Sequence, residues 1–262
     1  MKLVHLSDLH LTHDGAPLYG RSPLARLEQA VERILADDAD AAFCLLTGDL
    51  ADAGGNGAYA GLATAIARLP MPCHLLPGNH DDRAALREVF PDLPDDGNGF
   101  VQQSIATPAG RFLLLDTLRD GKPWGLLCPA RLGWLAAELE ATGDEPLFIA
   151  MHHPPFGVGI PTMDRFMLRG ADDFRATLAP HRARLRHLFL GHLHRPISGS
   201  WRGIPFSFTA SPNHQVALDL LNDGDDVPGC AEPSGYGVIL IDDERVVVHH
   251  RPLEGGETGF WL

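Results

Sequence analysis

The chain has 262 residues, of which 45% are hydrophobic and 21% charged, and its formal net charge is −13 because 34 acidic residues outnumber 21 basic ones. This length and composition predict a single globular domain over residues 1–262, with a sizeable core. Binding to DNA or RNA depends on clustered Lys and Arg, and the sequence contains no such cluster. We therefore expect no long nucleic acid as a partner.

The beginning of the chain and its four cysteines give no indication of export. The first candidate motif begins near residue 8, which leaves no room for a signal peptide, and no apolar run is long enough to span a membrane. The cysteines are far apart and form no C-x-x-C pair, so we expect free thiols. These features predict a cytoplasmic location and no membrane partner.

Short runs rich in Leu and β-branched residues predict buried strands, and apolar stripes at helical spacing predict helices between them. The predicted strands are residues 2–7, 42–47, 73–77, 112–116, 147–151 and 188–191. The predicted helices are residues 23–36, 58–69, 82–89 and 129–140. Ser22 fits the N-cap of the first helix and Pro23 its first position. This alternation predicts an α/β fold.

The last third of the chain has a different pattern. Residues 197–221 and 237–252 are typical of strands joined by turns, and we expect them to form a second sheet packed on the first. Segments 92–99 and 222–235 are rich in Asp, Gly and Pro and predict loops. The apolar runs at 204–208 and 216–221 favour a partly exposed sheet face, so residues 197–262 are a candidate interface for a homo-oligomer.

Five short phrases combine Asp, His or Asn, most of them beside Gly, and each follows a predicted strand. They are Asp8-Leu9-His10, Gly48-Asp49, Gly78-Asn79-His80-Asp81, His152-His153-Pro154 and Gly191-His192-Leu193-His194. Ligands of α/β sheets gather beyond the carboxyl ends of the strands, so one converging site explains all five phrases. We expect the paired side chains of D-x-H and H-x-H to point the same way from an extended backbone, and the glycines to permit close approach.

The residue types in these phrases suit divalent metals. Carboxylate, imidazole and amide oxygen are ligands of Mn, Fe, Zn, Co or Ni. Two such ions about 3.5–4 Å apart, bridged by one carboxylate, form a clamp for in-line displacement at phosphorus and turn bound water into a nucleophile near neutral pH. Bound cations also reverse the local potential of an acidic protein. The pattern therefore predicts a metal-dependent phosphoesterase.

The phrases, their order and their spacing resemble the calcineurin-like metallophosphoesterase family from Ser7 to about His194. The resemblance implies a four-layer α/β sandwich of two mixed β-sheets flanked by helices. It implies two divalent metal ions, drawn from Mn, Fe, Zn or Co, with Asp49 as a catalytic bridge and His80 as a catalytic non-ligand near the leaving group. The remaining ligands that it implies are Asp8, His10 and His194 for the first ion and Asn79, His152 and His192 for the second.

Neighbouring phrases are similar to bacterial class III cyclic-nucleotide phosphodiesterases and glycerophosphodiesterases. They are GNHDDR (78–83), HHPP (152–155), GIPTMD (159–164), GHLHRP (191–196) and AEPSGY (231–236). The similarity implies a small phosphodiester substrate of the cyclic-nucleotide or glycerophosphodiester type, hydrolysed by in-line attack of a metal-bound hydroxide. A phosphomonoesterase or a nucleotide pyrophosphatase is the alternative. A non-catalytic scaffold would be expected to lack ligands, and a DNA-processing nuclease would be expected to have a basic face.

Several polar residues near the motifs have two interpretations. Asp81 and Asp82 fit helix caps. His153 is either a group beside the metals or substrate, or a loop residue, and His214 is a candidate for the pocket wall. Five arginines are either surface charges or phosphate ligands, since the guanidinium fork matches phosphate geometry: Arg21, Arg83, Arg165, Arg169 and Arg195.

Overall fold

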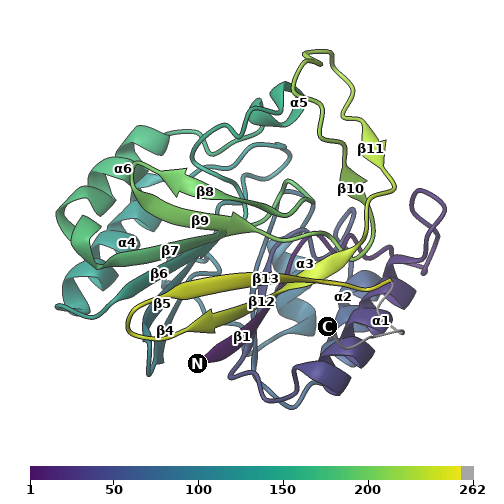
Figure 1. Ribbon diagram of the computed structural model, residues 1–262, viewed down its shortest axis with the longest axis horizontal. Helices are drawn as coiled ribbons and strands as arrows, with labels where there is room; N and C mark the ends of the chain where they lie inside the picture. The colour runs from purple at the N-terminus through teal and green to yellow at the C-terminus, as the bar shows by residue number, and fades with distance from the viewer. Residues whose placement is uncertain (255–262) are drawn as a thin grey trace, which may run out of the picture.

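Two β-sheets lie face to face with helices on their outer sides (Figure 1) in the computed structural model, which describes residues 1–254. The strands are β1 (Lys2–Leu6), β2 (Cys44–Thr47), β3 (Cys73–Leu76), β4 (Gln103–Thr107), β5 (Gly110–Leu115), β6 (Leu147–Met151), β7 (Leu185–Leu190), β8 (Ile197–Trp201), β9 (Ile204–Phe208), β10 (Gln215–Val216), β11 (Gly229–Cys230), β12 (Gly235–Ile241) and β13 (Val246–Pro252). The helices are α1 (Pro23–Asp37), α2 (Asn56–Ile66), α3 (Arg83–Val89), α4 (Pro129–Ala141), α5 (Pro161–Asp164), α6 (Ala171–Leu178) and the 3-10 helix η1 (Ala179–Arg184).

Each sheet mixes parallel and antiparallel pairs. One has the strand order β13-β12-β1-β2-β3 and the other the order β4-β5-β6-β7-β9-β8. Three apolar clusters fill the spaces between the layers: one between the first sheet and α1, α2 and α3, one between the two sheets, and one between the second sheet and α4 and α6. The predicted sandwich of two mixed sheets flanked by helices is therefore confirmed.

Local sequence explains where the elements begin and why the strands are so apolar. The Ser22 side chain accepts a hydrogen bond from the amide of Ala25, and Pro23 follows at the first position of α1. Every residue of β2 and β6 is buried. A central strand packed on both faces has no solvated side, so its sequence is a continuous apolar run instead of an alternating one.

Residues 197–221 and 237–252 do not together form a second sheet packed on the first, so that expectation was wrong. β8 and β9 extend the second sheet beyond β7, whereas β12 and β13 join the first sheet beside β1. β4 and α6 were not predicted from the sequence. In segment 216–221 only the first residue belongs to a strand, and the short β10–β11 pair stands away from both sheets (Figure 1).

Exposed apolar side chains gather in the loop after β10. Leu218, Leu220 and Leu221 are 59%, 56% and 92% exposed, whereas Ile204 in β9 is buried. Of the two apolar runs expected to form an exposed surface, the exposed leucines thus lie in this loop and not in β9, and the oligomer itself stays a prediction. Among residues 1–254 no helix is both long and apolar enough to cross a membrane.

Two histidines are buried between the sheets. The Nε2 atom of His5 lies 2.8 Å from the Thr47 hydroxyl, and that of His187 lies 2.9 Å from the Ser207 hydroxyl. Burial lowers the pKa of His5 to about 3 and that of His187 to about 4, from an ordinary value of 6.5. Both imidazoles are therefore neutral in the folded protein at neutral pH.

These histidines predict acid-sensitive stability. The two histidines take up protons near pH 6.5 in the unfolded chain but only near pH 4 or below in the folded chain. Their contribution to the free energy of unfolding is therefore complete above pH 6.5 and is lost as the pH falls below it. The loss between pH 7 and 5 is about 2 kcal/mol per histidine. His187→Gln keeps a polar partner for Ser207 and should lose about 2 kcal/mol less than the wild type over this range. Urea unfolding with a metal chelator in both samples measures the difference, and parallel pH profiles would contradict the prediction.

Candidate metal centre

The five sequence phrases meet at one edge of the sandwich. They follow the carboxyl ends of β1, β2 and β3 in one sheet and of β6 and β7 in the other. Within each sheet these strands run parallel, so their carboxyl ends open on the same side. The structure brings all seven candidate ligands together there, and six of them are at most 6% exposed: Asp8, His10, Asp49, His152, His192 and His194.

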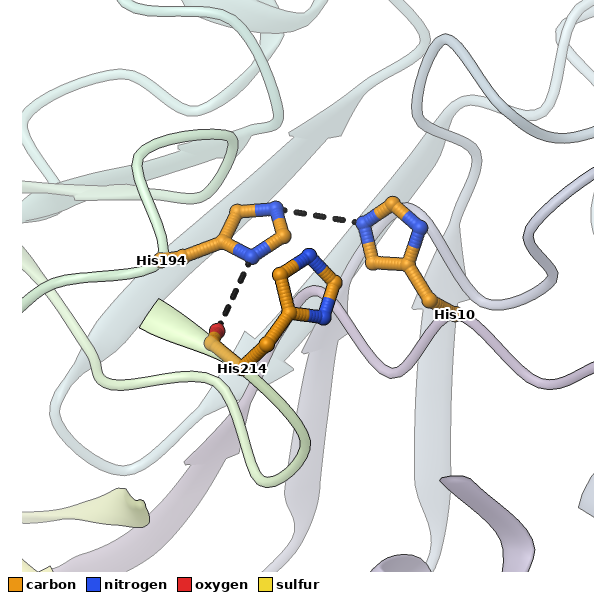
Figure 2. Close-up of side chains that lie close together, drawn as sticks. All are labelled: His10, His194 and His214. Carbon is orange, nitrogen blue, oxygen red and sulfur yellow. Dashed lines mark hydrogen bonds between the residues drawn. The ribbon is translucent and has the colours of Figure 1, made fainter. Parts of the chain in front are cut away.

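The first group of ligand atoms comes from Asp8, His10, Asp49 and His194, all within 4.8 Å of one another. The Nε2 atoms of His10 and His194 lie 3.1 Å apart, and Figure 2 shows the two rings facing each other across this gap. His10 Nε2 is also 3.5 Å from Asp49 Oδ2, and His194 Nε2 is 3.7 Å from Asp8 Oδ1. Two carboxylates and two imidazoles thus surround one point.

The second group lies on the other side of Asp49. The Nε2 atom of His152 is 3.2 Å from Asn79 Oδ1 and 3.3 Å from Asp49 Oδ2. The ring of His192 is centred 5.1 Å from that of His152, and its buried Nε2 has no hydrogen-bond partner among the described residues. The same oxygen of Asp49 therefore faces both groups.

Hydrogen bonds behind the histidines orient their rings. The Nδ1 atom of His10 donates to Asp52 Oδ1 at 3.1 Å, that of His152 to the Thr47 carbonyl at 2.7 Å, and that of His194 to the His214 carbonyl at 3.1 Å. In the neutral form of each ring, a proton on Nδ1 leaves Nε2 with a lone pair pointing to the centre, the usual arrangement of metal-binding histidines. Two such lone pairs would repel each other across the 3.1 Å between His10 and His194, and either a shared proton, as in the hydrogen bond drawn in Figure 2, or a bound cation removes the repulsion. The residues therefore fit divalent metal ions.

The electrostatics of the protein groups alone show which protons such ions must displace. Burial raises the pKa of Asp8 to about 6, with a further contribution from the Asp49 carboxylate. Burial opposes charge on His152, but Asp49 and Asp8 outweigh it and raise its pKa to about 9. His152 is therefore protonated at neutral pH when no cation is bound. Cation binding must release this proton and becomes stronger as the pH rises.

The backbone at the site is left-handed, which corrects the expected extended conformation. Positive φ angles occur at five candidate ligands: Asp8 (58°), His10 (49°), Asp49 (48°), His192 (77°) and His194 (52°). Among the other non-glycine residues described, only Tyr19 and Arg202 share this conformation. It costs about 1–3 kcal/mol at a non-glycine residue and persists only where the surroundings enforce it. The fold therefore concentrates strain at its candidate ligands.

Close backbone approach requires glycine beside the ligands, as expected from the sequence. A Cβ atom on Gly78 would lie 2.2 Å from Asp49 Oδ1 and 2.4 Å from the Asp49 amide. One on Gly191 would lie 2.3 Å from the Ser7 hydroxyl. Any side chain at these positions would push apart the loops that carry Asp49, Asn79 and His192.

A cavity of about 590 Å³ opens onto the two groups. His80 lines it, with Nδ1 donating to the Asp52 carbonyl at 2.6 Å and the side chain 41% exposed. The His214 ring also lines it, centred 4.4 Å from that of His194 (Figure 2). The apolar part of the cavity lining consists of Pro123, Met163, Phe166, Val216, Val227 and Pro228.

Arg21 is the one arginine that lines this cavity. Its Nη1 atom donates to the Asn213 carbonyl at 2.9 Å and to the Ser234 hydroxyl at 3.0 Å, and no carboxylate within residues 1–254 forms an ion pair with it. Of the other candidates, Arg169 is bonded to a carbonyl, and three pair with carboxylates: Arg83 with Asp116, Arg165 with Asp225 and Arg195 with Glu232. A free positive charge at this site therefore comes from Arg21.

His153 and Asp81 are both structural parts of the site. His153 is buried, its Nδ1 lies 2.7 Å from the Thr117 hydroxyl, and its ring is centred 4.8 Å from those of both His152 and His192. His153 is therefore a buried group beside the candidate ligands and not a plain loop residue.

Asp82 caps α3 as expected by accepting from the Ala85 amide, but Asp81 does not cap the helix. The Asp81 side chain instead accepts hydrogen bonds from the loops that carry candidate ligands.

Comparison with known proteins identifies the family. The sequence pattern of the calcineurin-like phosphoesterases matches residues 1–196. The chain belongs to this family. The phosphoesterase is 44% identical over 252 residues, covering 95% of this chain and 91% of the other, to a probable cyclic nucleotide phosphodiesterase of Rhodopseudomonas palustris. It is 31% identical to a probable glycerophosphodiester phosphodiesterase of Arcobacter nitrofigilis, over 85% of this chain and 82% of that protein.

Solved structures agree with the fold of the phosphoesterase. A dimetal phosphatase from Danio rerio superimposes with a TM-score of 0.71 over 97% of this chain and 96% of that one, at 15% identity. Such low identity supports the fold alone. Family membership, together with the carboxylate and imidazole groups at the sheet edge, makes the protein a hydrolase that depends on divalent metal ions.

Proposed function

We propose that this metal-dependent phosphodiesterase holds two divalent ions and hydrolyses cyclic nucleotides. The observation that carries the dinuclear assignment is the position of Asp49, whose Oδ2 faces His10 on one side and His152 on the other. One oxygen shared by two groups of ligands fits a bridging carboxylate. The proposed ligands are Asp8, His10 and His194 on one side, Asn79, His152 and His192 on the other, and Asp49 between them.

The protein groups around the cavity divide the remaining tasks. When bound, divalent ions supply Lewis acidity at phosphorus and lower the pKa of water. The Nδ1–H of His80 donates to the Asp52 carbonyl, so the general acid is the imidazolium form of His80, which gives the proton on Nε2 to the oxygen of the departing alkoxide and is left as the neutral imidazole. Arg21 adds a fixed positive charge that favours an anionic substrate.

The cavity wall favours a substrate with an apolar face. Met163, Phe166 and Val227 line the same cavity as the metal groups and offer apolar surface on which a nucleobase attached to the cyclic phosphate would bury its ring. A glycerol substituent has no comparable apolar surface. The name of the Rhodopseudomonas palustris relative supports the same substrate class. Cyclic nucleotides are therefore preferred over glycerophosphodiesters within this proposal.

A substrate panel on metal-reconstituted protein tests the proposal. We expect two ions per chain by metal analysis under metal excess, and the highest kcat/KM for a cyclic nucleotide. The panel also contains a glycerophosphodiester, an aryl diester, an aryl monoester and a nucleotide pyrophosphate. A single well-filled site would contradict the dinuclear assignment. A preference for the monoester or the pyrophosphate would contradict the proposal that the substrate is a diester. A preference for the glycerophosphodiester would overturn only the choice of cyclic nucleotides.

A further inference from the structure

The buried carboxylate of Asp81 joins two of the loops that carry candidate ligands. Its Oδ2 accepts hydrogen bonds from the Gly78 amide at 2.8 Å and the Leu50 amide at 3.1 Å, and its Oδ1 accepts one from the Ala51 amide at 3.0 Å. The residue is only 7% exposed. Gly78 directly precedes Asn79, and Leu50 directly follows Asp49, so one side chain holds both loops.

The Leu50 and Ala51 amides converge on Asp81 because of the left-handed turn before them. Gly48 and Asp49 have φ angles of 88° and 48°, which direct the two following N–H groups to the same point. Successive amides arranged in this way form a concave anion-binding site, and here a carboxylate of the chain itself fills it. Asp81 thus stabilises the strained backbone of the proposed bridging ligand.

The connection extends to the loop after β1. The His10 amide donates to the Asp49 carbonyl at 2.9 Å, and the Leu11 amide donates to the Leu50 carbonyl at 3.1 Å. A shift of residues 49–51 would therefore move His10 as well. The loops after β1, β2 and β3 form one hydrogen-bonded unit with the Asp81 carboxylate at its base.

Tyr59 supports this carboxylate from α2. Its buried hydroxyl donates to Asp81 Oδ1 at 3.0 Å and accepts from the Asp82 amide at 2.9 Å. Asp81 thus receives four hydrogen bonds, three from backbone amides and one from a hydroxyl. All four require an acceptor at this position, which a carboxylate supplies on both oxygens and an amide on only one.

We propose that Asp81 is a positioning residue that sets the affinity for the metal ions by fixing the loops of Asp49, Asn79 and His10. The proposal rests on the metal ligands proposed above. Asp81 does not face the cavity lined by the ligands, so it acts through the backbone and not by contact with an ion or substrate. Groups that orient metal ligands typically contribute about 10–100-fold in metal affinity.

The test compares Mn²⁺ binding by Asp81→Asn, Tyr59→Phe and the wild type with isothermal titration calorimetry. The Asn side chain places an amide nitrogen against backbone N–H groups, so we expect Mn²⁺ affinity to fall by about 10–100-fold. Activity should be lost at limiting Mn²⁺ and should largely return at saturating Mn²⁺. Tyr59→Phe removes one of the four hydrogen bonds, and we expect a fall of a few-fold.

Asp82→Asn is the matched control, because the neighbouring Asp82 caps α3 and makes no contact with the amides of residues 50, 51 or 78. Its Mn²⁺ affinity should remain within about twofold of the wild type, in keeping with a role in helix capping. The metal-free forms are also compared by urea unfolding. A loss of stability in Asp81→Asn without a change in Mn²⁺ affinity would overturn the proposal, and so would an equal loss of affinity in Asp82→Asn.

If Asp81→Asn does not fold, Tyr59→Phe decides the question, and unchanged affinity in that variant overturns the proposal. Failure of the metal assignment gives a different result. A wild-type protein that binds fewer than two Mn²⁺ ions under metal excess would contradict the proposed dinuclear centre. A wild type with two ions and an Asp81→Asn variant of equal affinity would contradict the role of Asp81 alone.

Discussion

Asp49→Asn is expected to lower phosphodiesterase activity by about 10²-fold or more, even at saturating metal. The Oδ2 atom of Asp49 lies between the two groups of ligands, 3.5 Å from His10 Nε2 and 3.3 Å from His152 Nε2. A neutral amide removes the negative charge between two proposed cations. Asn tolerates the left-handed backbone at this position, so the variant should fold. Initial rates and metal content, measured on the same preparations, give the result.

Asp82→Asn serves as the control, since it makes the same chemical change at a helix cap outside the cavity. We expect its rate to remain near that of the wild type. An Asp49→Asn protein with near-normal rates at saturating metal would show that Asp49 does not bridge the ions. An Asp49→Asn protein that binds two ions tightly but has no activity would show that Asp49 is needed for the reaction and not for metal binding.

His80→Ala should keep the full metal content but lose about 10²–10⁴-fold in rate on diesters with an alkoxide leaving group. Nδ1 of His80 is bonded to the Asp52 carbonyl, so the ring is fixed at the cavity wall with its other nitrogen available to substrate. A nitrophenolate departs without much protonation, whereas a ribose alkoxide does not. The loss on a nitrophenyl diester should therefore be much smaller.

The comparison needs kinetics on both substrates together with metal analysis of each preparation. His13→Ala is the matched control, because His13 is an exposed histidine that does not line the cavity. We expect it to behave as the wild type on both substrates. Equal losses on the two substrates in His80→Ala would make His80 a group that positions substrate, and loss of metal would make it a ligand.

The sequence alone predicts the chemistry and the elements that carry it, because both depend on local information. Buried parallel strands appear as apolar runs, and the capping of α1 follows from Ser22 and Pro23. The phrases around Asp8 and Asp49 could be placed at strand ends because a change from apolar to polar residues marks the point where a strand leaves the core. Side-chain type then limits the site to hard or borderline cations.

Sheet membership, by contrast, is decided by packing between distant parts of the chain. β8 and β9 have the same strand pattern as β12 and β13, yet the first pair joins β7 and the second joins β1. Period-two alternation identifies a strand but not its neighbour, since any strand edge offers the same backbone donors and acceptors. β4 was missed because its sequence, QSIAT, carries a weak apolar signal at the edge of a sheet.

The conformation of the ligands and the partners of the charged groups also come from the tertiary structure. The left-handed backbone of Asp8 and His10 is enforced by hydrogen bonds to the neighbouring loop, which no local pattern encodes. Asp81 and Asp82 look alike in sequence, but only Asp81 reaches the amides beyond β2. Arg21 lines the cavity, and no carboxylate within residues 1–254 forms an ion pair with it. Local residue types therefore determine that metals are bound, and long-range contacts determine the geometry in which they are held.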